Sequence, residues 1–170
     1  QVDAAPGEHG RDQVCAVHTD GTFRCYASSD DHRELWWWFT QANFLAADEH
    51  AIVGDFDGDR ADDVLKYKPS TGAIELWTRV PGRSEFAPLP TFALGNLAGI
   101  DRKNKVLLAG DFGQAAGRDD LLVWDQAAGT IARYDSATDG DGKRTFWWAF
   151  TTKSGYLSAG RHVHVANFSG

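Results

Sequence analysis

The sequence lacks the features that would place the protein in a membrane or on nucleic acid. No apolar run approaches the roughly 20 residues of a membrane-spanning helix, although 42% of the 170 residues are hydrophobic. No block of basic residues is present, and 17 lysines and arginines are outnumbered by 24 acidic residues, which gives a net charge of −7. Because nucleic acids and anionic membranes attract basic surfaces, this balance argues against both as partners.

The sequence motifs of common enzymes are also missing. There is no Gly-x-Ser-x-Gly elbow, no His-Glu-x-x-His zinc motif and no glycine loop for phosphate, and YLSAG at Tyr156 is not a nucleophile elbow. His162 and His164 lie two residues apart, but no third ligand is evident, which favours a polar strand face over a metal site. We therefore expect no enzyme, and an extracellular hydrolase with a carboxylate pair is the less favoured alternative.

Only two cysteines are present, and both fall in the segment QVCAVHTDGTFRCY. Two alternating runs flank Thr19, Asp20 and Gly21, which predicts a hairpin with a three-residue loop and Gly21 in the left-handed conformation. Cys15 and Cys25 are each five residues from Asp20, so they face each other and predict a cross-strand disulfide; the alternative is two buried thiols. A disulfide favours a secreted, extracellular protein.

Helical periodicity is scarce, and the chain instead repeats a pattern of short strands. Segments that begin at Gly10, Arg60 and Gly117 each contain an acidic step, an apolar strand, a glycine turn and a second strand that ends in an aromatic residue. The corresponding residues are Asp12, Asp62 and Asp119 at the acidic step, Gly21, Gly72 and Gly129 in the turn, and Tyr26, Trp77 and Tyr134 at the end.

Two further elements flank these hairpins. AIVGDFDG, LLAGDFGQ and VHVANFSG come before the acidic steps, whereas RELWWWFT and RTFWWAFT follow the hairpins, with RSEFAPLP as a degenerate middle copy. Each unit therefore contains about four short strands, which is the pattern of a propeller blade.

We predict an all-β, β-propeller-like domain of three four-stranded repeats, in residues 10–170, preceded by an N-terminal arm in residues 1–9. The repeats span approximately residues 10–50, 51–105 and 106–161. The third blade is split between the termini, since residues 162–170 supply the strand that the N-terminal hairpin lacks, and joining the two ends removes exposed sheet edges. Three blades make a tight ring, so a homodimer that completes a larger propeller and a fragment of a longer chain are open alternatives.

The acidic segment DFDGDRADD resembles the calcium loop of FG-GAP/VCBS repeats, which occur in integrin α-subunit propellers and in many secreted bacterial proteins. The family pattern is Asp-x-Asp/Asn-Gly-Asp-Gly-x-x-Asp before a hydrophobic strand, and this chain departs from it at Arg60, where glycine is usual. Alternate carboxylates in a tight loop suit calcium, which takes about six to eight oxygens. The resemblance implies a calcium site with these ligands: the side chains of Asp55, Asp57, Asp59 and Asp63 and the carbonyl of Ala61.

An acidic turn without a cation is the alternative, in which the aspartates accept hydrogen bonds from the loop backbone. The related loop from Asp111 has lost its central acids, and DSATDGDGK from Asp135 lacks the acid of a following strand. Neither is expected to hold calcium well.

Tryptophan is plentiful, with seven in the chain. Three are consecutive in LWWWFT, and two recur at the matching positions of FWWAFT. Neighbours on a strand point to opposite faces, so most of these rings are expected in the core, while one or two form an apolar platform for sugar rings. The candidate ligand-binding residues are Trp37, Trp38 and Trp148.

These features together predict a secreted, calcium-stabilised binding module whose exposed aromatics take a glycan. The alternative is a protein–protein interaction module of the inhibitor or adhesin type with an extracellular protein as partner. The segment VPGRSEFAPLP from Val80 would suit such a partner, although Pro88 and Pro90 also fit an irregular connection.

Overall fold

The computed structural model describes residues 13–28, 34–80, 85–89, 105–113, 117–138, 140–142, 144–152 and 155. Within these ranges the chain forms eleven β-strands and no helix, so the predicted all-β class is confirmed. In the same ranges we find no helix with the length and apolar character needed to cross a membrane.

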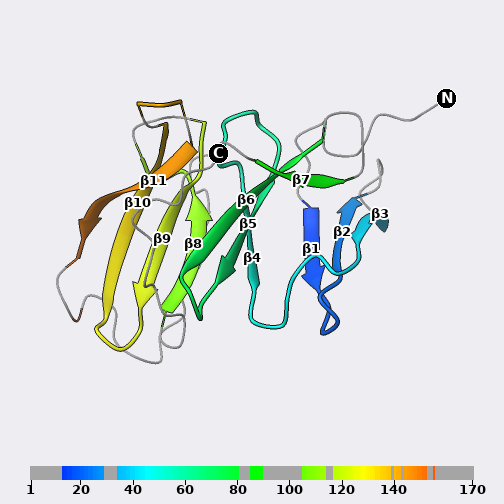
Figure 1. Ribbon diagram of the computed structural model, residues 1–170, viewed down its shortest axis with the longest axis horizontal. Helices are drawn as coiled ribbons and strands as arrows, with labels where there is room; N and C mark the ends of the chain where they lie inside the picture. The colour runs from blue at the N-terminus through cyan, green and yellow to red at the C-terminus, as the bar shows by residue number, and fades with distance from the viewer. Residues whose placement is uncertain are drawn as a thin grey trace.

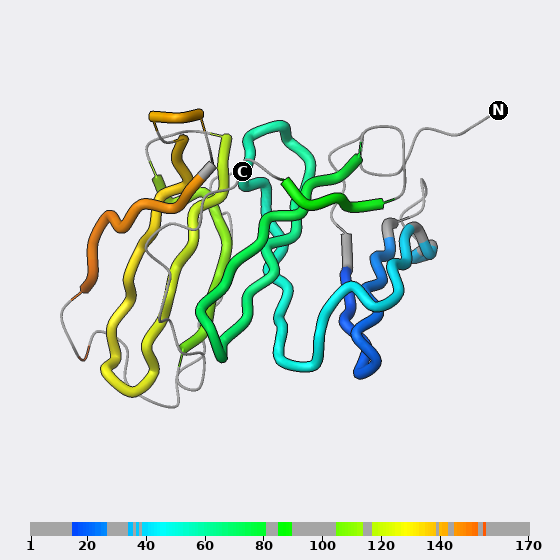
Figure 2. Tube along the Cα trace, in the orientation of Figure 1, coloured from blue at the N-terminus to red at the C-terminus, as the bar shows by residue number. Residues whose placement is uncertain are grey.

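The strands form three antiparallel sheets (Figure 1). Sheet 1 contains β1 (Gln13–Val17), β2 (Phe23–Ser28) and β3 (Leu35–Gln41). Sheet 2 contains β4 (His50–Gly54), β5 (Asp63–Lys68), β6 (Ala73–Arg79) and β7 (Phe86–Pro88). Sheet 3 contains β8 (Lys105–Gly110), β9 (Asp120–Asp125), β10 (Thr130–Thr138) and β11 (Arg144–Thr151). Figure 2 shows the trace passing from sheet 1 through sheet 2 to sheet 3, so strands that are consecutive in the chain are also neighbours in space.

The N-terminal hairpin forms as its sequence predicts. Strands β1 and β2 pair antiparallel with Cys15 opposite Cys25, and the two residues form a disulfide. Gly21 has a φ of 78° in the connecting turn, the left-handed conformation that glycine adopts without steric cost. An added Cβ there would meet the backbone carbonyl oxygen of Leu45, and that residue and Phe44 both donate their N–H groups to the carbonyl of Gly21. The turn of sheet 1 is therefore bound directly to the chain that leads into sheet 2.

A cluster of aromatic rings joins sheets 1 and 2. Phe23 and Phe39 from sheet 1 lie with their ring centroids 6.2 and 5.1 Å from that of Phe86 in β7. Phe44 stacks on Phe23 at 5.2 Å and meets Trp77 of β6 edge-on at 5.1 Å. Each such pair contributes about 0.5–1.5 kcal/mol beyond the area that it buries, so the cluster holds sheet 1 firmly against sheet 2.

A second cluster joins sheets 2 and 3. Leu65 and Tyr67 of β5 are fully buried in the same cluster as Leu121 of β9. Phe56, just after β4, meets Phe146 of β11 edge-on at a centroid distance of 5.6 Å. The first five residues of β5 are all buried, because sheet 2 lies in the middle and each of its faces packs against a neighbouring sheet.

The ring closure that the sequence predicts falls outside the described part of the chain. Residues 162–170, expected to complete the blade that is split between the termini, and the arm in residues 1–9 belong to the ranges that are not described. Among the described residues the three sheets form a row, and none of them closes on itself (Figure 1). Consequently sheets 1 and 3 each have an outer face that no other described sheet covers.

Candidate functional site

An acidic corner, residues 55–63, connects β4 to β5. Gly58 and Arg60 both have positive φ, of 84° and 71°, so the backbone reverses twice within a few residues. Asp55 stabilises this path, since its Oδ1 accepts the N–H of Gly58 at 2.7 Å and its Oδ2 accepts that of Arg60 at 2.9 Å. The left-handed conformation at Arg60 is one that glycine adopts without steric cost.

Two other aspartates of the corner bond the backbone locally. The Oδ1 of Asp57 accepts the N–H of Asp59 at 3.0 Å, and the Oδ1 of Asp59 accepts the N–H of Ala61 at 2.8 Å. Both are short-range bonds that span two residues, the pattern of an Asx-turn. The backbone bonding expected of an acidic turn is therefore present.

Asp63 is the buried member of the corner. Its side chain is at the start of β5 and only 1% exposed, and its Oδ2 accepts the N–H groups of Phe56 and Asp57 at 3.0 and 3.2 Å. The pKa of this carboxyl is raised to about 8, first by burial and then by the nearby charges of Asp57, Asp59 and Asp55, while the hydrogen bond from Phe56 lowers it. A divalent cation would reverse this balance, because it stabilises the ionised form.

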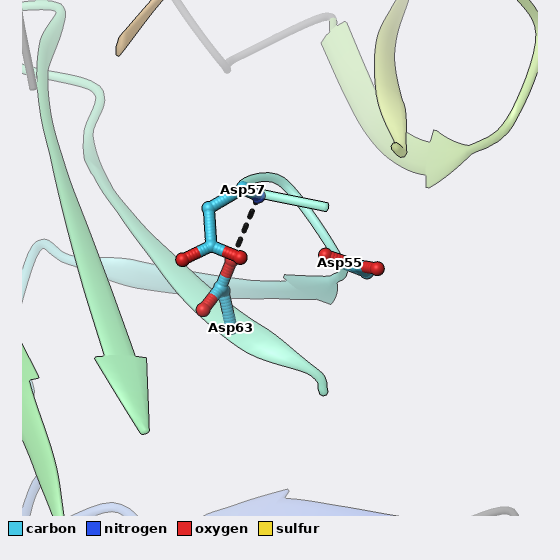
Figure 3. A group of neighbouring side chains, drawn as sticks. All are labelled: Asp55, Asp57 and Asp63. Carbon is cyan, nitrogen blue, oxygen red and sulfur yellow. Dashed lines mark hydrogen bonds between the residues drawn. The ribbon is translucent and has the colours of Figure 1, made fainter. Parts of the chain in front are cut away.

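Three of the predicted ligands converge. One carboxylate oxygen each from Asp55, Asp57 and Asp63 lies within 4.8 Å of the other two. In Figure 3 the carboxylates of Asp57 and Asp63 approach each other, while Asp55 lies on the other side of the loop. Asp59 is outside this group, and the N–H of Ala61 is bonded to it. The donor set is all oxygen and strongly anionic, so it fits a hard cation such as calcium better than a transition metal.

Sheet 3 contains an equivalent corner, of which residues 111–113 and 117–120 are described. Asp120 is buried at the start of β9, as Asp63 is at the start of β5. Its Oδ2 accepts the N–H of Phe112 at 3.1 Å and its Oδ1 accepts that of Ser136 at 2.9 Å. Burial raises the pKa of Asp120 as well. This second corner thus has the same buried aspartate, without a converging acidic group among its described residues.

The two corners are bonded to each other through Asp119. Its Oδ2 accepts the N–H of Asp55 at 2.9 Å, and its own N–H donates to the carbonyl of Asp55 at 2.6 Å. An added Cβ at Gly54 would meet the Asp119 carboxylate, so glycine is required for this close approach. Sequence reasoning identified Asp119 only as a repeated acid and missed its role as a link between sheets 2 and 3.

The exposed tryptophans occupy matching places in sheets 1 and 3. Trp37 is 66% exposed and pairs with Tyr26, and Trp148 is 55% exposed and pairs with Tyr134. Both indoles donate their Nε1–H to the hydroxyl of the threonine three residues later. Trp37 donates to Thr40 at 2.7 Å, and Trp148 donates to Thr151 at 3.0 Å. The third candidate, Trp38, has a side chain outside the described part of the structure.

A bulge makes this indole–threonine bond possible. The register of β2 with β3 shifts between Cys25 and Tyr26, so Trp38 has no residue opposite it. The same shift in sheet 3 leaves Ala149 unpaired. Because strand residues alternate between faces, one extra residue puts Trp37 and Thr40 on the same face although they are three positions apart.

An open pocket of about 440 Å³ lies beside Trp37, and its lining residues are Arg24, Tyr26, Trp37 and Thr40. These residues lie on the outer face of sheet 1, since Arg24 pairs with Thr40 and Tyr26 with Trp37. The pocket combines two aromatic rings with a hydroxyl and a guanidinium group.

The outer face of sheet 3 also presents aromatic rings. Trp147 and Phe150 are 54% and 42% exposed. The guanidinium group of Arg133 lies 5.1 Å from the centroid of the Phe150 ring and forms an ion pair with Asp135 at 2.7 Å. This face therefore has an apolar surface next to a neutralised pair of charges.

No protein-family model matches the chain, and neither a curated protein nor a solved structure does. The argument for function consequently depends on the acidic corner and on the exposed tryptophans of sheets 1 and 3.

Proposed function

We propose that this protein is a secreted carbohydrate-binding module that calcium stabilises, built on propeller-type sheets of the FG-GAP/VCBS kind. The observation that carries the proposal is the pair of exposed indoles, Trp37 and Trp148, each tied by its Nε1–H to a threonine. A core tryptophan would be buried, whereas both of these rings are more than half exposed at matching positions. The disulfide between Cys15 and Cys25 supports an extracellular location.

A fixed indole is suited to stacking on a sugar. The hydrogen bond to Thr40 satisfies the one polar group of Trp37 and limits rotation of the ring, so little conformational entropy is lost when a ligand binds. The apolar C–H face of a pyranose can then lie on the indole, while Tyr26, Arg24 and the Thr40 hydroxyl supply hydrogen bonds at its edge. One aromatic surface with a few polar groups is the usual composition of a small-ligand pocket.

Calcium has a structural role in this proposal. Held by Asp55, Asp57 and Asp63, it would neutralise a group of charges that otherwise oppose the burial of Asp63. The corner precedes β5, which packs against both neighbouring sheets, so the ion would stabilise the middle of the domain. A melting temperature that does not rise when calcium replaces chelator would refute this part.

Titration of a glycan that the protein binds tests the proposed platform. Trp37→Ala should weaken binding at least about fivefold, the equivalent of roughly 1 kcal/mol for a lost aromatic contact. Trp147→Ala is the matched control, because Trp147 is similarly exposed, but among the described residues it has no threonine bond and does not line the pocket. Equal affinities of these two variants would contradict a role for Trp37.

A second candidate function, protein–protein interaction, is supported by the outer face of sheet 3. Trp147 and Phe150 are exposed there, next to the paired charges of Arg133 and Asp135. Such a surface suits an extracellular protein or a second copy of the chain, which would extend the row of sheets toward a larger propeller. Light scattering of the wild type and of a Trp147→Ser, Phe150→Ser variant tests self-association; a wild type that is monomeric at high concentration excludes the homodimer.

A further inference from the structure

We infer that the pocket beside Trp37 selects a pyranose that carries an anionic group, a carboxylate or a sulfate ester, at its edge. This inference rests on the proposed function, because it names the class of sugar for the same site. The residue that carries it is Arg24, which lines the pocket together with Tyr26, Trp37 and Thr40.

Arg24 is placed to meet a ligand rather than another part of the protein. It pairs with Thr40 across β2 and β3, its side chain is exposed, and it lies on the face that Trp37 occupies. Among the described residues, no hydrogen bond or ion pair involves its guanidinium group. By contrast, Arg133 in sheet 3 is bonded to Asp135 and to the carbonyl of Phe112.

The guanidinium group of Arg24 is a positive charge on a protein whose net charge is negative. Among the residues that the structure describes, Arg24 is the one charged residue that lines the pocket, and the whole chain has a net charge of −7. An anionic sugar is attracted to this cation, while the net negative charge of the chain opposes nonspecific binding of anions. A guanidinium group offers five N–H donors in a planar fork that matches a carboxylate with two parallel hydrogen bonds, and it bonds the oxygens of a sulfate ester as well.

Sheet 3 supplies an internal comparison. Ala132 pairs with Thr151 there, as Arg24 pairs with Thr40 in sheet 1. Trp148 thus has the same indole–threonine bond without the cation, and Ala132 packs against the cluster that joins sheets 2 and 3.

Calorimetry with matched ligands tests the inference. The probes are an oligogalacturonate, its fully methyl-esterified form and a sulfated galactan of the same length. We expect the wild type to bind at least one acidic probe about tenfold more tightly than the ester, because charge-assisted hydrogen bonds are the strong ones. Whichever acid is preferred identifies the anionic group. The preference should shrink as salt is raised, because an exposed pair is screened.

Two variants separate this inference from the proposed function. Arg24→Gln should bring the affinities for acid and ester within about twofold of each other, whereas Trp37→Ala should weaken both probes and keep the preference for the acid. Equal wild-type affinities for acid and ester, or a preference that survives in Arg24→Gln, would overturn the inference and leave the glycan platform standing. Absence of wild-type binding to every probe, or binding that Trp37→Ala leaves unchanged, would overturn both.

Discussion

Asp63→Asn is the substitution that tests most sharply how the acidic corner is stabilised. Asparagine removes the charge from the buried start of β5 and retains an oxygen that can accept the N–H groups of Phe56 and Asp57. The backbone of the corner therefore keeps its bonds, and the measured effect reports on the charge.

The expected magnitude follows from the pKa of Asp63. In the absence of a cation this carboxyl has a pKa of about 8 in the folded protein, against 3.8 for an unperturbed aspartate, which we take for the unfolded chain. Between these values folding takes up a proton, so the contribution of Asp63 to stability falls as the pH rises from 3.8 to about 8. About three pH units lie between 3.8 and pH 7, and at roughly 1.36 kcal/mol per unit the loss reaches about 4 kcal/mol.

The two ionic conditions should give opposite results. In chelator, Asp63→Asn does not lose stability through ionisation of a buried carboxyl. At pH 7 it should therefore be more stable than the wild type, by up to about 4 kcal/mol. In calcium the wild type regains that stability, because the ion binds the ionised carboxylate, and the variant gains less. Asp63→Asn should therefore be the more stable protein in chelator, and the wild type the more stable one in calcium.

Urea unfolding at pH 5 and pH 8, in calcium and in chelator, measures all of these quantities. Asp120→Asn is the matched control, since Asp120 is the buried aspartate of a corner whose described residues have no converging acids. The stability of Asp120→Asn relative to the wild type should change with pH in the same direction as that of Asp63→Asn. Calcium should not alter this difference. A variant at Asp63 that is less stable than the wild type in chelator at pH 8 would refute the reasoning.

Three further predictions concern the links between the sheets. Reducing the disulfide between Cys15 and Cys25, which are 10 residues apart, should lower the free energy of unfolding by about 3 kcal/mol, measured in urea with and without reductant; no change would contradict it. Gly21→Ala should cost more than about 1 kcal/mol in a thermal melt, because the φ of 78° and the clash with Leu45 both oppose a side chain; an unchanged melt would show that the turn adapts. Asp119→Ala should lower the free energy of unfolding by about 1–3 kcal/mol. Asp119→Asn should lower it less, because asparagine keeps an oxygen that can accept the N–H of Asp55. Equal losses in the two variants would count against a stabilising role of this hydrogen bond.

Local chemistry made part of the fold predictable. The hairpin of sheet 1 follows from the spacing of Cys15 and Cys25 around a short loop with Gly21, and the structure confirms each of these features. The all-β class follows from short alternating runs between glycine turns, which depend only on neighbouring residues. The convergence of Asp55 and Asp57 with Asp63 also depends on a segment of nine residues.

Contacts between distant residues were not predictable in this way. Asp119 accepts a hydrogen bond from a residue 64 positions earlier, and no local pattern indicates such a partner. Strand alternation alone also misplaces the threonine beside Trp37, because it does not show where a bulge inserts an extra residue. The recurrence of a threonine three residues after Trp37 and Trp148 was the available signal for the bulge.

The most direct test of the central claim is a glycan array run in calcium with the wild type, Trp37→Ala and the control Trp147→Ala. The account predicts selective binding of the wild type to a few related sugars, loss of that signal in Trp37→Ala, and retention of it in Trp147→Ala. A blank array for the wild type, or the same pattern for all three proteins, would contradict a carbohydrate-binding function and favour the protein-interaction surface of sheet 3.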